Sequence, residues 1–286
     1  MKPPAPHRVL IVTALAMLAF AGNSLLCRLA LKLTTIEPLM FTAIRLLSGA
    51  VVLCAFLLLT RRRPAVAGAG SWWSAAWLFV YAAAFSMAYV RLPTGTGALL
   101  LFASVQITMF SAGIWSGERI SLPKGAGLTI AMGGLVLLLF PGISAPPAAS
   151  AAWMIASGVA WGIYSLRGKT GLDPVATTAG NFLRSVPFGL AAAATVFSGT
   201  PIDGEGALYA VISGALTSGI GYVIWYRALR DLTATVAATV QLSVPVIAAF
   251  GGAVFIGDDM TTRLLLGSAI VLGGIGLSLA RFESRR

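Results

Sequence analysis

Long apolar runs, separated by short polar gaps, dominate the pattern along this chain. Each run is close to the ~20 residues that an α-helix needs to cross the hydrocarbon core of a bilayer. Many gaps contain Pro, Gly or charged residues, which commonly mark the ends of such helices. The pattern predicts ten membrane-spanning helices, at residues 9–31, 38–60, 72–92, 95–116, 122–141, 151–167, 174–198, 206–227, 233–256 and 263–281.

Composition supports a membrane protein over a soluble one. Hydrophobic residues make up 58% of the chain, charged residues only 10%, and the mean hydropathy is +0.89. A soluble domain has roughly one-quarter charged residues, so this chain cannot cover a water-facing surface. The net charge of +11 does not indicate a nucleic-acid partner, because most Lys and Arg lie in the gaps between apolar runs. The fold class expected is an all-α polytopic membrane protein, with the lipid bilayer as its surroundings.

The distribution of basic residues predicts the orientation. They concentrate in alternate gaps, as at residues 61–63, and only Lys32, Arg91 and Arg263 fall in the others. Cytoplasmic loops carry the excess of Lys and Arg in membrane proteins. We therefore expect a multi-pass protein of the bacterial inner membrane with both termini in the cytoplasm.

The second half of the chain repeats the first. Residues 117–139 align without a gap with residues 257–279. Further pairs in nearly the same register are Gly22 with Gly162 and Arg45 with Arg184. A repeat of five helices has an odd count, so consecutive copies enter the membrane from opposite sides. The prediction is two inverted five-helix repeats, residues 1–145 and 146–286, an arrangement typical of secondary transporters.

Several short motifs carry a resemblance to a known family. They are Trp161-Gly162, one Arg in the second helix of each half (Arg45 and Arg184), Gly117-Glu118-Arg119-Ile120-Ser121, and the Gly-Gly pairs of the fifth and tenth helices. The chain resembles the drug/metabolite transporter superfamily in its EamA-type family, and the resemblance extends to YddG-type exporters. That implies export of amino acids, notably aromatic ones. The departures are Ala21-Gly22 in place of Trp-Gly, Gln106 in place of a proline, and Gly257-Asp258 in place of Gly-Glu.

Polar residues within the spans are the first candidates for a substrate site, because a transport path needs groups that are costly against lipid. The large amides are Asn23, Gln106, Asn181 and Gln241. Helix–helix hydrogen bonding is the alternative role for each of them. For Arg45 and Arg184, contact with a substrate carboxylate and a structural role on backbone carbonyls are equally open.

Aromatic residues at helical spacing form the second group. The candidates for lining a central cavity are Tyr81, Tyr89, Trp161, Tyr164 and Tyr222, with ordinary packing as the alternative. A buried Tyr or Trp needs a partner for its O–H or N–H, and a hydrated cavity offers one. Pro245 interrupts the backbone hydrogen bonding of the ninth span, which favours a gating role there.

The chemistry missing from the spans excludes several classes of protein. No Asp or Glu lies in the middle of a span, and the single His is His7. We expect no enzyme, no metal site and no cofactor, because an intramembrane hydrolase or a zinc site would need such groups. Only Glu118, at the end of the fourth span, is placed to couple transport to protons.

These observations predict a secondary transporter that exports small metabolites through a central cavity by alternating access. Amino acids, including aromatic ones, are the favoured substrates, and the transport is expected to be facilitative. Two alternatives stay open: a carrier of nucleotide sugars or other metabolites with the same fold, and a non-transporting membrane sensor or assembly protein.

Overall fold

The computed structural model describes residues 6–60, 69–117, 122–139, 147–168, 173–199, 201–257 and 262–279, which form ten helical rods and no β-strand. Seven rods are single helices: α1 (Pro6–Leu33), α2 (Pro38–Leu59), α4 (Trp72–Tyr89), α5 (Thr94–Trp115), α6 (Leu122–Leu139), α7 (Ala148–Gly168) and α8 (Pro174–Ala194). The eighth rod is composite, running through α9 (Gly204–Ile212), η1 (Ser213–Ile220) and α10 (Gly221–Leu229). The ninth consists of α11 (Ala234–Gln241) and α12 (Ser243–Ile256), and the tenth is α13 (Thr262–Leu279).

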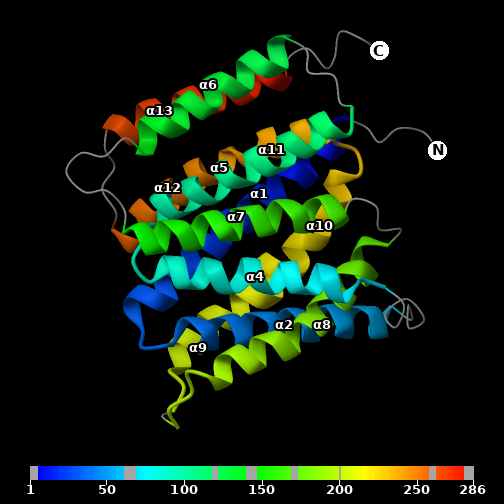
Figure 1. Ribbon diagram of the computed structural model, residues 1–286, viewed down its shortest axis with the longest axis vertical. Coiled ribbons are helices and arrows are strands. Elements are labelled where there is room, and N and C mark those ends of the chain that lie inside the picture. The colour runs from blue at the N-terminus through cyan, green and yellow to red at the C-terminus, as the bar shows by residue number, and fades with distance from the viewer. Residues whose placement is uncertain are drawn as a thin grey trace.

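The rods correspond one for one to the apolar runs of the sequence. Consecutive rods alternate in direction, so the start of α1 and the end of α13 lie at the same end of the bundle (Figure 1). Six rods are long and apolar enough to span a membrane: His7–Leu33, Pro38–Leu59, Thr94–Trp115, Ala148–Gly168, Gly204–Leu229 and Thr239–Ile256. The all-helical prediction is therefore confirmed for the described residues, while the full number of ten spans stays a prediction. Glu118 and the basic run at 61–63 lie outside these residues.

Local sequence explains where several helices begin. Asp173 and Asp203 precede α8 and α9, and their carboxylates accept hydrogen bonds from backbone N–H groups of the first turn. Ser71 does the same for α4 through its hydroxyl oxygen. These side chains satisfy donors that the start of a helix leaves without intrahelical partners.

Two of the rods are not regular helices. In the eighth rod, residues Ser213–Ile220 form a π-helix, whose wider turns often occur at functional sites. The ninth rod is interrupted at Leu242, between α11 and α12. Pro245 has no N–H to donate to the carbonyl of Gln241 four residues earlier, which accounts for the interruption.

The packing pairs each helix of the first half with one of the second. α2 packs on α8, α6 packs on α13, and α5 packs on α11 and α12. α1 packs on α10 and η1, and α7 packs on α4 in the corresponding way. At the crossing of α6 and α13, a Cβ added to Gly274 would lie 2.5 Å from the backbone nitrogen of Ala131, so the small residue permits the close approach.

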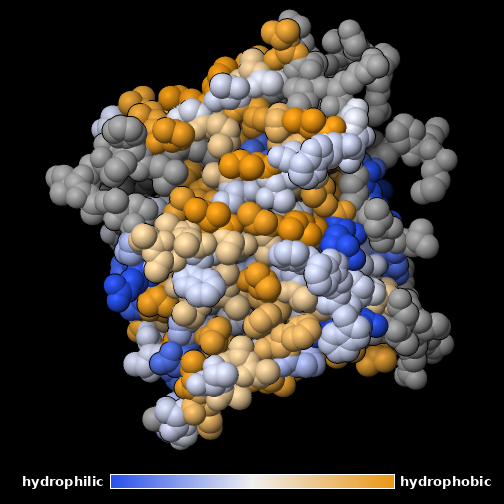
Figure 2. All heavy atoms as spheres, in the orientation of Figure 1, coloured by the Kyte–Doolittle hydropathy of each residue, from blue (hydrophilic) through white to orange (hydrophobic). Residues whose placement is uncertain are grey.

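The exterior of the bundle is apolar along much of its length. On the face in Figure 2, hydrophobic residues extend across the middle, and the strongly hydrophilic residues gather toward the two ends of the helices. Across the molecule, large apolar side chains such as Leu18, Val51 and Leu216 expose about half of their surface (55%, 57% and 55%). An apolar band of this kind suits contact with lipid.

Candidate functional site

A polar network lies in the middle of the bundle, where α1 and α2 of the first half meet η1 and α10 of the second. The side-chain oxygen of Asn23 accepts hydrogen bonds from Ser213 and Thr217, each at 2.7 Å, and from Ser218 at 3.2 Å. The Asn23 nitrogen donates to the hydroxyl of Tyr222 at 3.3 Å. The π-helix brings the three hydroxyls of η1 onto one acceptor, so it shapes this network.

Arg45 is the only charged side chain in that network, and it is buried, with 1% of its surface exposed. Its Nε donates to Ser218 at 2.9 Å, and one terminal nitrogen, Nη2, donates to Tyr222 at 2.8 Å and to Tyr81 at 3.1 Å. The other terminal nitrogen, Nη1, has no hydrogen-bond partner. The guanidinium also lies 5.1 Å from the centre of the Phe85 ring. All of its partners are neutral, so the buried positive charge has no carboxylate beside it among the described residues.

Close approach of the backbones makes this arrangement possible. A Cβ added to Gly214 of η1 would fall within 2.8 Å of the carbonyl of Arg45, so only glycine fits there. Gly49, one turn after Arg45, likewise faces Gly214 and the ring of Phe182. Small residues at these positions allow α2 to contact the π-helix directly.

Aromatic rings fill the space next to the polar network. Trp161 of α7 lies at the centre of this aromatic cluster, with ring centroids 4.6 Å from Tyr222, 4.9 Å from Tyr81 and 5.2 Å from Phe20. Tyr164 extends the cluster one turn further, 5.8 Å from Trp161. None of these five side chains exposes more than 4% of its surface. The structure is therefore closed around the centre, and a solute can enter only if helices separate.

Two buried amides, from the fourth and ninth rods, differ in their bonding. Gln241 accepts a hydrogen bond from the indole N–H of Trp161 at 2.9 Å, and its own nitrogen donates to the carbonyl of Ala237 at 3.1 Å. Gln106 is 2% exposed, yet neither its oxygen nor its nitrogen has a partner. Buried polar groups are usually paired, so Gln106 retains bonding capacity that a ligand could use.

The other candidate residues, Asn181, Arg184 and Tyr89, make hydrogen bonds to the backbone. The Asn181 oxygen accepts from the backbone N–H of Ser71 at 2.9 Å, and Arg184 Nη1 donates to the carbonyl of Ala69 at 2.7 Å. Both contacts hold the segment before α4, so Arg184 has the carbonyl-binding role left open by the sequence. The hydroxyl of Tyr89 donates to the carbonyl of Thr94 at 3.3 Å, across the α4–α5 connection. Substrate contact stays a prediction for all of them.

Sequence reasoning missed three members of the centre. Phe20 sits among apolar neighbours with no polar signal to distinguish it, and Met109 contacts Gln241 through its sulfur at 3.4 Å. Ser213 lies in a small-residue stretch that reads as ordinary helix packing. Only the π-helical geometry of η1 turns its hydroxyl toward Asn23.

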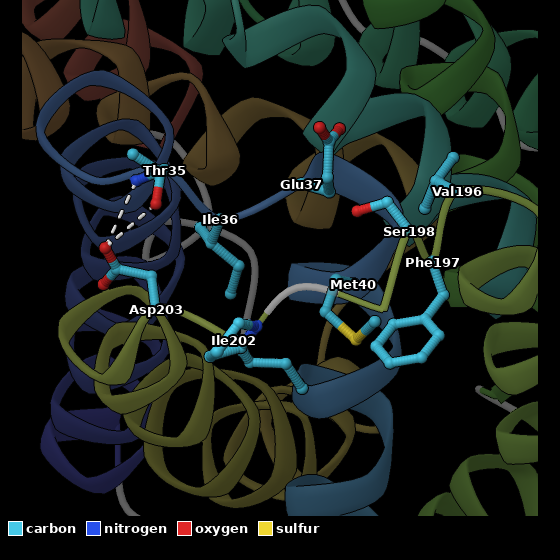
Figure 3. Close-up of a pocket in the computed structure, with 10 residues that line it drawn as sticks. Thr35, Ile36, Glu37, Met40, Val196, Phe197, Ser198, Ile202 and Asp203 are labelled. Carbon is cyan, nitrogen blue, oxygen red and sulfur yellow. Dashed lines mark hydrogen bonds between the residues drawn. The ribbon is translucent and has the colours of Figure 1, made fainter.

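A pocket opens at one end of the bundle, between the α1–α2 connection and the α8–α9 connection. Its residues include Glu37, Met40, Phe197 and Ile202. Figure 3 shows Asp203 and Thr35 facing each other at its edge, where the carboxylate accepts from the Thr35 hydroxyl at 3.2 Å. The N–H of Gly206, which donates to Asp203 at 2.8 Å, lowers the pKa of that carboxyl below its ordinary value. Asp203 thus joins the start of α9 to the α1–α2 connection.

The described residues offer no metal centre, since no group of three His, Cys, Asp or Glu side chains could hold an ion there. The cysteines of this part, Cys27 and Cys54, are both free. The chemistry of the centre is therefore that of hydrogen bonds, aromatic faces and one positive charge.

Comparison with known protein families identifies the chain. The model of the EamA-like transporter family matches it twice, at residues 7–140 and 148–280. The chain belongs to the EamA-like transporter family. The two matched segments are the two helix sets that pair across the centre, so the EamA fold of two repeats fits the packing described above. The family resemblance drawn from Trp161-Gly162 and the paired arginines is confirmed.

Individual relatives agree with this membership. An uncharacterized protein of Pseudomonas aeruginosa is 55% identical over 96% of this chain and 95% of its own length. A protein of Streptantibioticus cattleyicolor described as a probable terminal-alkyne amino-acid exporter is 28% identical over 69% of this chain and 68% of its own. An uncharacterized transporter of Bacillus subtilis, YoaV, is 22% identical over 88% of this chain and 90% of its own.

A solved structure shares the fold. A crystal structure of an undescribed protein superposes with a TM-score of 0.79 at 18% identity, covering 96% of this chain and 98% of that one. At this identity the likeness concerns the arrangement of helices alone. The family and the relatives establish a membrane transporter.

Proposed function

We propose that this EamA-family protein exports small metabolites, with amino acids and among them aromatic ones as its substrates. The observation that carries the proposal is the centre itself. Side chains of the two halves meet there. Asn23 and Arg45 of the first half donate hydrogen bonds to Tyr222 of the second. The ring of Tyr81 packs against that of Trp161. A polar site shared by two repeats at mid-depth is where secondary transporters bind their substrates.

Contacts that close both ends of the bundle support a mechanism of alternating access. At the end that holds the α1–α2 connection, Asp203 joins Thr35 and Arg28 donates to the carbonyl of Tyr89 at 2.9 Å. At the opposite end, Arg184 and Asn181 hold the segment before α4. We infer that these two sets of contacts open in turn as the two repeats move against each other. The second set faces the cytoplasm if the basic loops are inside, as the positive-inside rule requires.

The aromatic cluster is the basis for the substrate class. A planar side chain can replace one of the contacts around Trp161, because aromatic pairs at 4.5–7 Å are favourable in several geometries. The unpartnered Gln106 oxygen is available as an acceptor for an ammonium group. The relative described as an amino-acid exporter lends support from outside the chain.

Flux in liposomes tests this function directly. The purified protein should release preloaded L-phenylalanine and L-tryptophan faster than protein-free vesicles, and faster than it releases a nucleotide sugar. Release of the nucleotide sugar alone would favour the alternative carrier. Binding without any flux would favour the non-transporting sensor.

Variants of α7 tie the flux to the aromatic cluster. Trp161→Ala and Tyr164→Ala should raise the apparent KM for aromatic amino acids by about 10-fold, since an aromatic pair contributes up to ~1.5 kcal/mol. Trp153→Ala is the matched control, because Trp153 lies on the same helix with 47% of its surface exposed. An unchanged KM in both cluster variants, with normal amounts of folded protein, would remove these rings from the site.

A further inference from the structure

The bonding around Arg45 has more donors than acceptors. Arg45 Nη1 is buried and has no partner. Tyr81 and Tyr222 each carry one hydroxyl hydrogen. The Tyr222 hydroxyl donates a hydrogen bond to the Tyr81 oxygen at 3.2 Å. Both oxygens also accept from Arg45 Nη2. The Tyr81 hydroxyl, which accepts this hydrogen bond, therefore keeps a hydrogen with no acceptor among the described residues.

The positive charge of Arg45 is also without a counter-ion among the described residues. Arg45 cannot lose its proton at any ordinary pH. A buried cation without a paired anion is costly, and buried charges in proteins are normally paired. In the described part of the chain, hydroxyl oxygens and ring faces surround this guanidinium, and the free thiol of Cys27 lies near it. Arg45 Nη1 and the Tyr81 hydroxyl are therefore two buried donors beside an uncompensated positive charge.

We propose that Arg45 Nη1 and the Tyr81 hydroxyl form the subsite for a carboxylate of the exported solute, an inference that rests on the proposed transport function. One carboxylate oxygen accepts a hydrogen bond from Arg45 Nη1, and the other accepts one from the hydroxyl of Tyr81. The Asn23, Ser218 and Tyr222 bonds hold the guanidinium in position for this contact. A monoanion balances the single charge, whereas a phosphate dianion would leave a buried negative charge.

The two repeats have diverged at this position. Arg184 is the counterpart of Arg45 in the second half, but its Nη1 donates to the carbonyls of Ala69 and Gly180, at 2.7 Å and 3.0 Å. One arginine of the pair therefore binds backbone carbonyls, while the other keeps a buried terminal nitrogen without a hydrogen-bond partner. The arginine of the carboxylate subsite therefore comes from the first repeat, and Ser218 and Tyr222 of the second repeat hold it.

Ligand-dependent thermal stability of the full-length protein tests the subsite independently of transport. The probes are L-phenylalanine, phenylacetate, L-phenylalaninamide, phenethylamine and phenyl phosphate. The two carboxylates should raise Tm at concentrations about 10- to 100-fold lower than the amide and the amine, the ratio expected for a charged hydrogen bond. Equal effects of acid and amide, no effect of either acid, or a preference for phenyl phosphate would each overturn the proposal.

Variants assign the preference to the named groups. Arg45→Gln should reduce the acid-to-amide ratio to about one, and Arg45→Lys should keep part of it because the charge remains. Arg184→Gln is the matched control and should leave the ratio unchanged. If Arg45→Gln does not fold, Tyr81→Phe replaces it and should lower the ratio several-fold. An unaltered acid-to-amide ratio in folded Arg45→Gln would refute the subsite. If Tyr81→Phe has to be used in its place, an unaltered ratio in that variant would refute the subsite as well.

The outcomes separate this inference from the proposed function. Preference for carboxylates without amino-acid flux would refute export and keep the subsite. Flux of phenethylamine and the amide equal to that of phenylalanine would keep transport and refute the subsite.

Discussion

At the residue scale, the two central glutamines show how burial alone fails to reveal a role. Gln241 and Gln106 are both buried, with 0% and 2% of their surface exposed. Gln241 satisfies the indole N–H of Trp161, so it supports the aromatic cluster in the closed state. Gln106 satisfies nothing in that state, and its burial costs free energy that a bound solute could recover.

Replacement of each glutamine by leucine should therefore have opposite effects on stability. Gln241→Leu leaves the Trp161 N–H buried and unpaired, and we expect a loss of ~1–3 kcal/mol in unfolding free energy. Gln106→Leu removes two unpaired polar atoms and should leave Tm unchanged or higher. Its amino-acid flux should nevertheless fall by about 10-fold if Gln106 receives the substrate. A destabilised Gln106→Leu protein would show that the amide has an interhelical role instead.

At the element scale, the contacts at helix ends and helix crossings decide which segments can move. Asp203 caps α9 and bonds to the α1–α2 connection, so it links a helix of each half. The pair α6 and α13 lies at one edge of the bundle (Figure 1), on the far side of α5 and α12 from the aromatic cluster. We infer that the contact between Asp203 and the α1–α2 connection changes during transport, and that the crossing of α6 and α13 stays intact.

The charge of Asp203 predicts a pH dependence at that end. Its carboxyl pKa in the folded protein lies below the ordinary value of roughly 3.9. The charged form thus adds stability above that pH, and the contribution is lost as the pH falls through the folded-state pKa. Asp203→Ala should lower Tm at pH 7 and approach the parent protein near pH 3. Asp203→Asn, which can still cap α9, should lower Tm less and is the control. A Tm difference between parent and Asp203→Ala that is constant from pH 7 to 3 would contradict this.

The glycine pairs of α6 and α13 allow a matched comparison. A Cβ at Gly274 would lie 2.5–2.9 Å from backbone and side-chain atoms of α6, whereas a Cβ at Gly273 would have nothing within 4 Å. Gly274→Ala should therefore lower Tm. Gly273→Ala should raise it slightly, because alanine favours a helix over glycine by up to ~1 kcal/mol. Equal Tm shifts would mean that the two helices do not cross at Gly274.

At the scale of the whole molecule, the centre has the features of a carrier that lacks its own proton relay. The described residues around it titrate only through Tyr and Cys side chains, and the one cation there is an arginine. Proton-coupled carriers use Asp, Glu or His within the membrane. We propose on this basis that the protein moves its solute down the solute's own gradient.

An imposed pH difference should consequently have little effect on transport. In liposomes with equal amino-acid concentrations on both sides, a pH step of two units should produce no net accumulation. The same vesicles with a tenfold amino-acid gradient should show rapid net flux, which serves as the positive control. Uphill accumulation driven by the pH step and abolished by Glu118→Gln would show that Glu118 couples protons to transport.

The sequence by itself determined the helical class, the positions of the apolar rods and the membership of the family. Rod length and hydropathy are local properties of the sequence. Motifs such as Trp161-Gly162 can likewise be recognised without knowing which residues are in contact. The residues Trp161, Tyr222 and Arg45 were also within its reach, because aromatic or charged side chains are conspicuous in an apolar span.

Only the tertiary structure decided what each polar residue contacts. Arg45 and Arg184 occupy equivalent positions in the repeat, yet one faces neutral hydroxyls and the other binds backbone carbonyls. The π-helix that contains Ser213 and Ser218 packs against α2, where a Cβ at Gly214 would clash with the carbonyl of Arg45. Such contacts join segments far apart in the chain. Hydrogen-bond partners are set by the three-dimensional approach of helices, which periodicity along one helix does not encode.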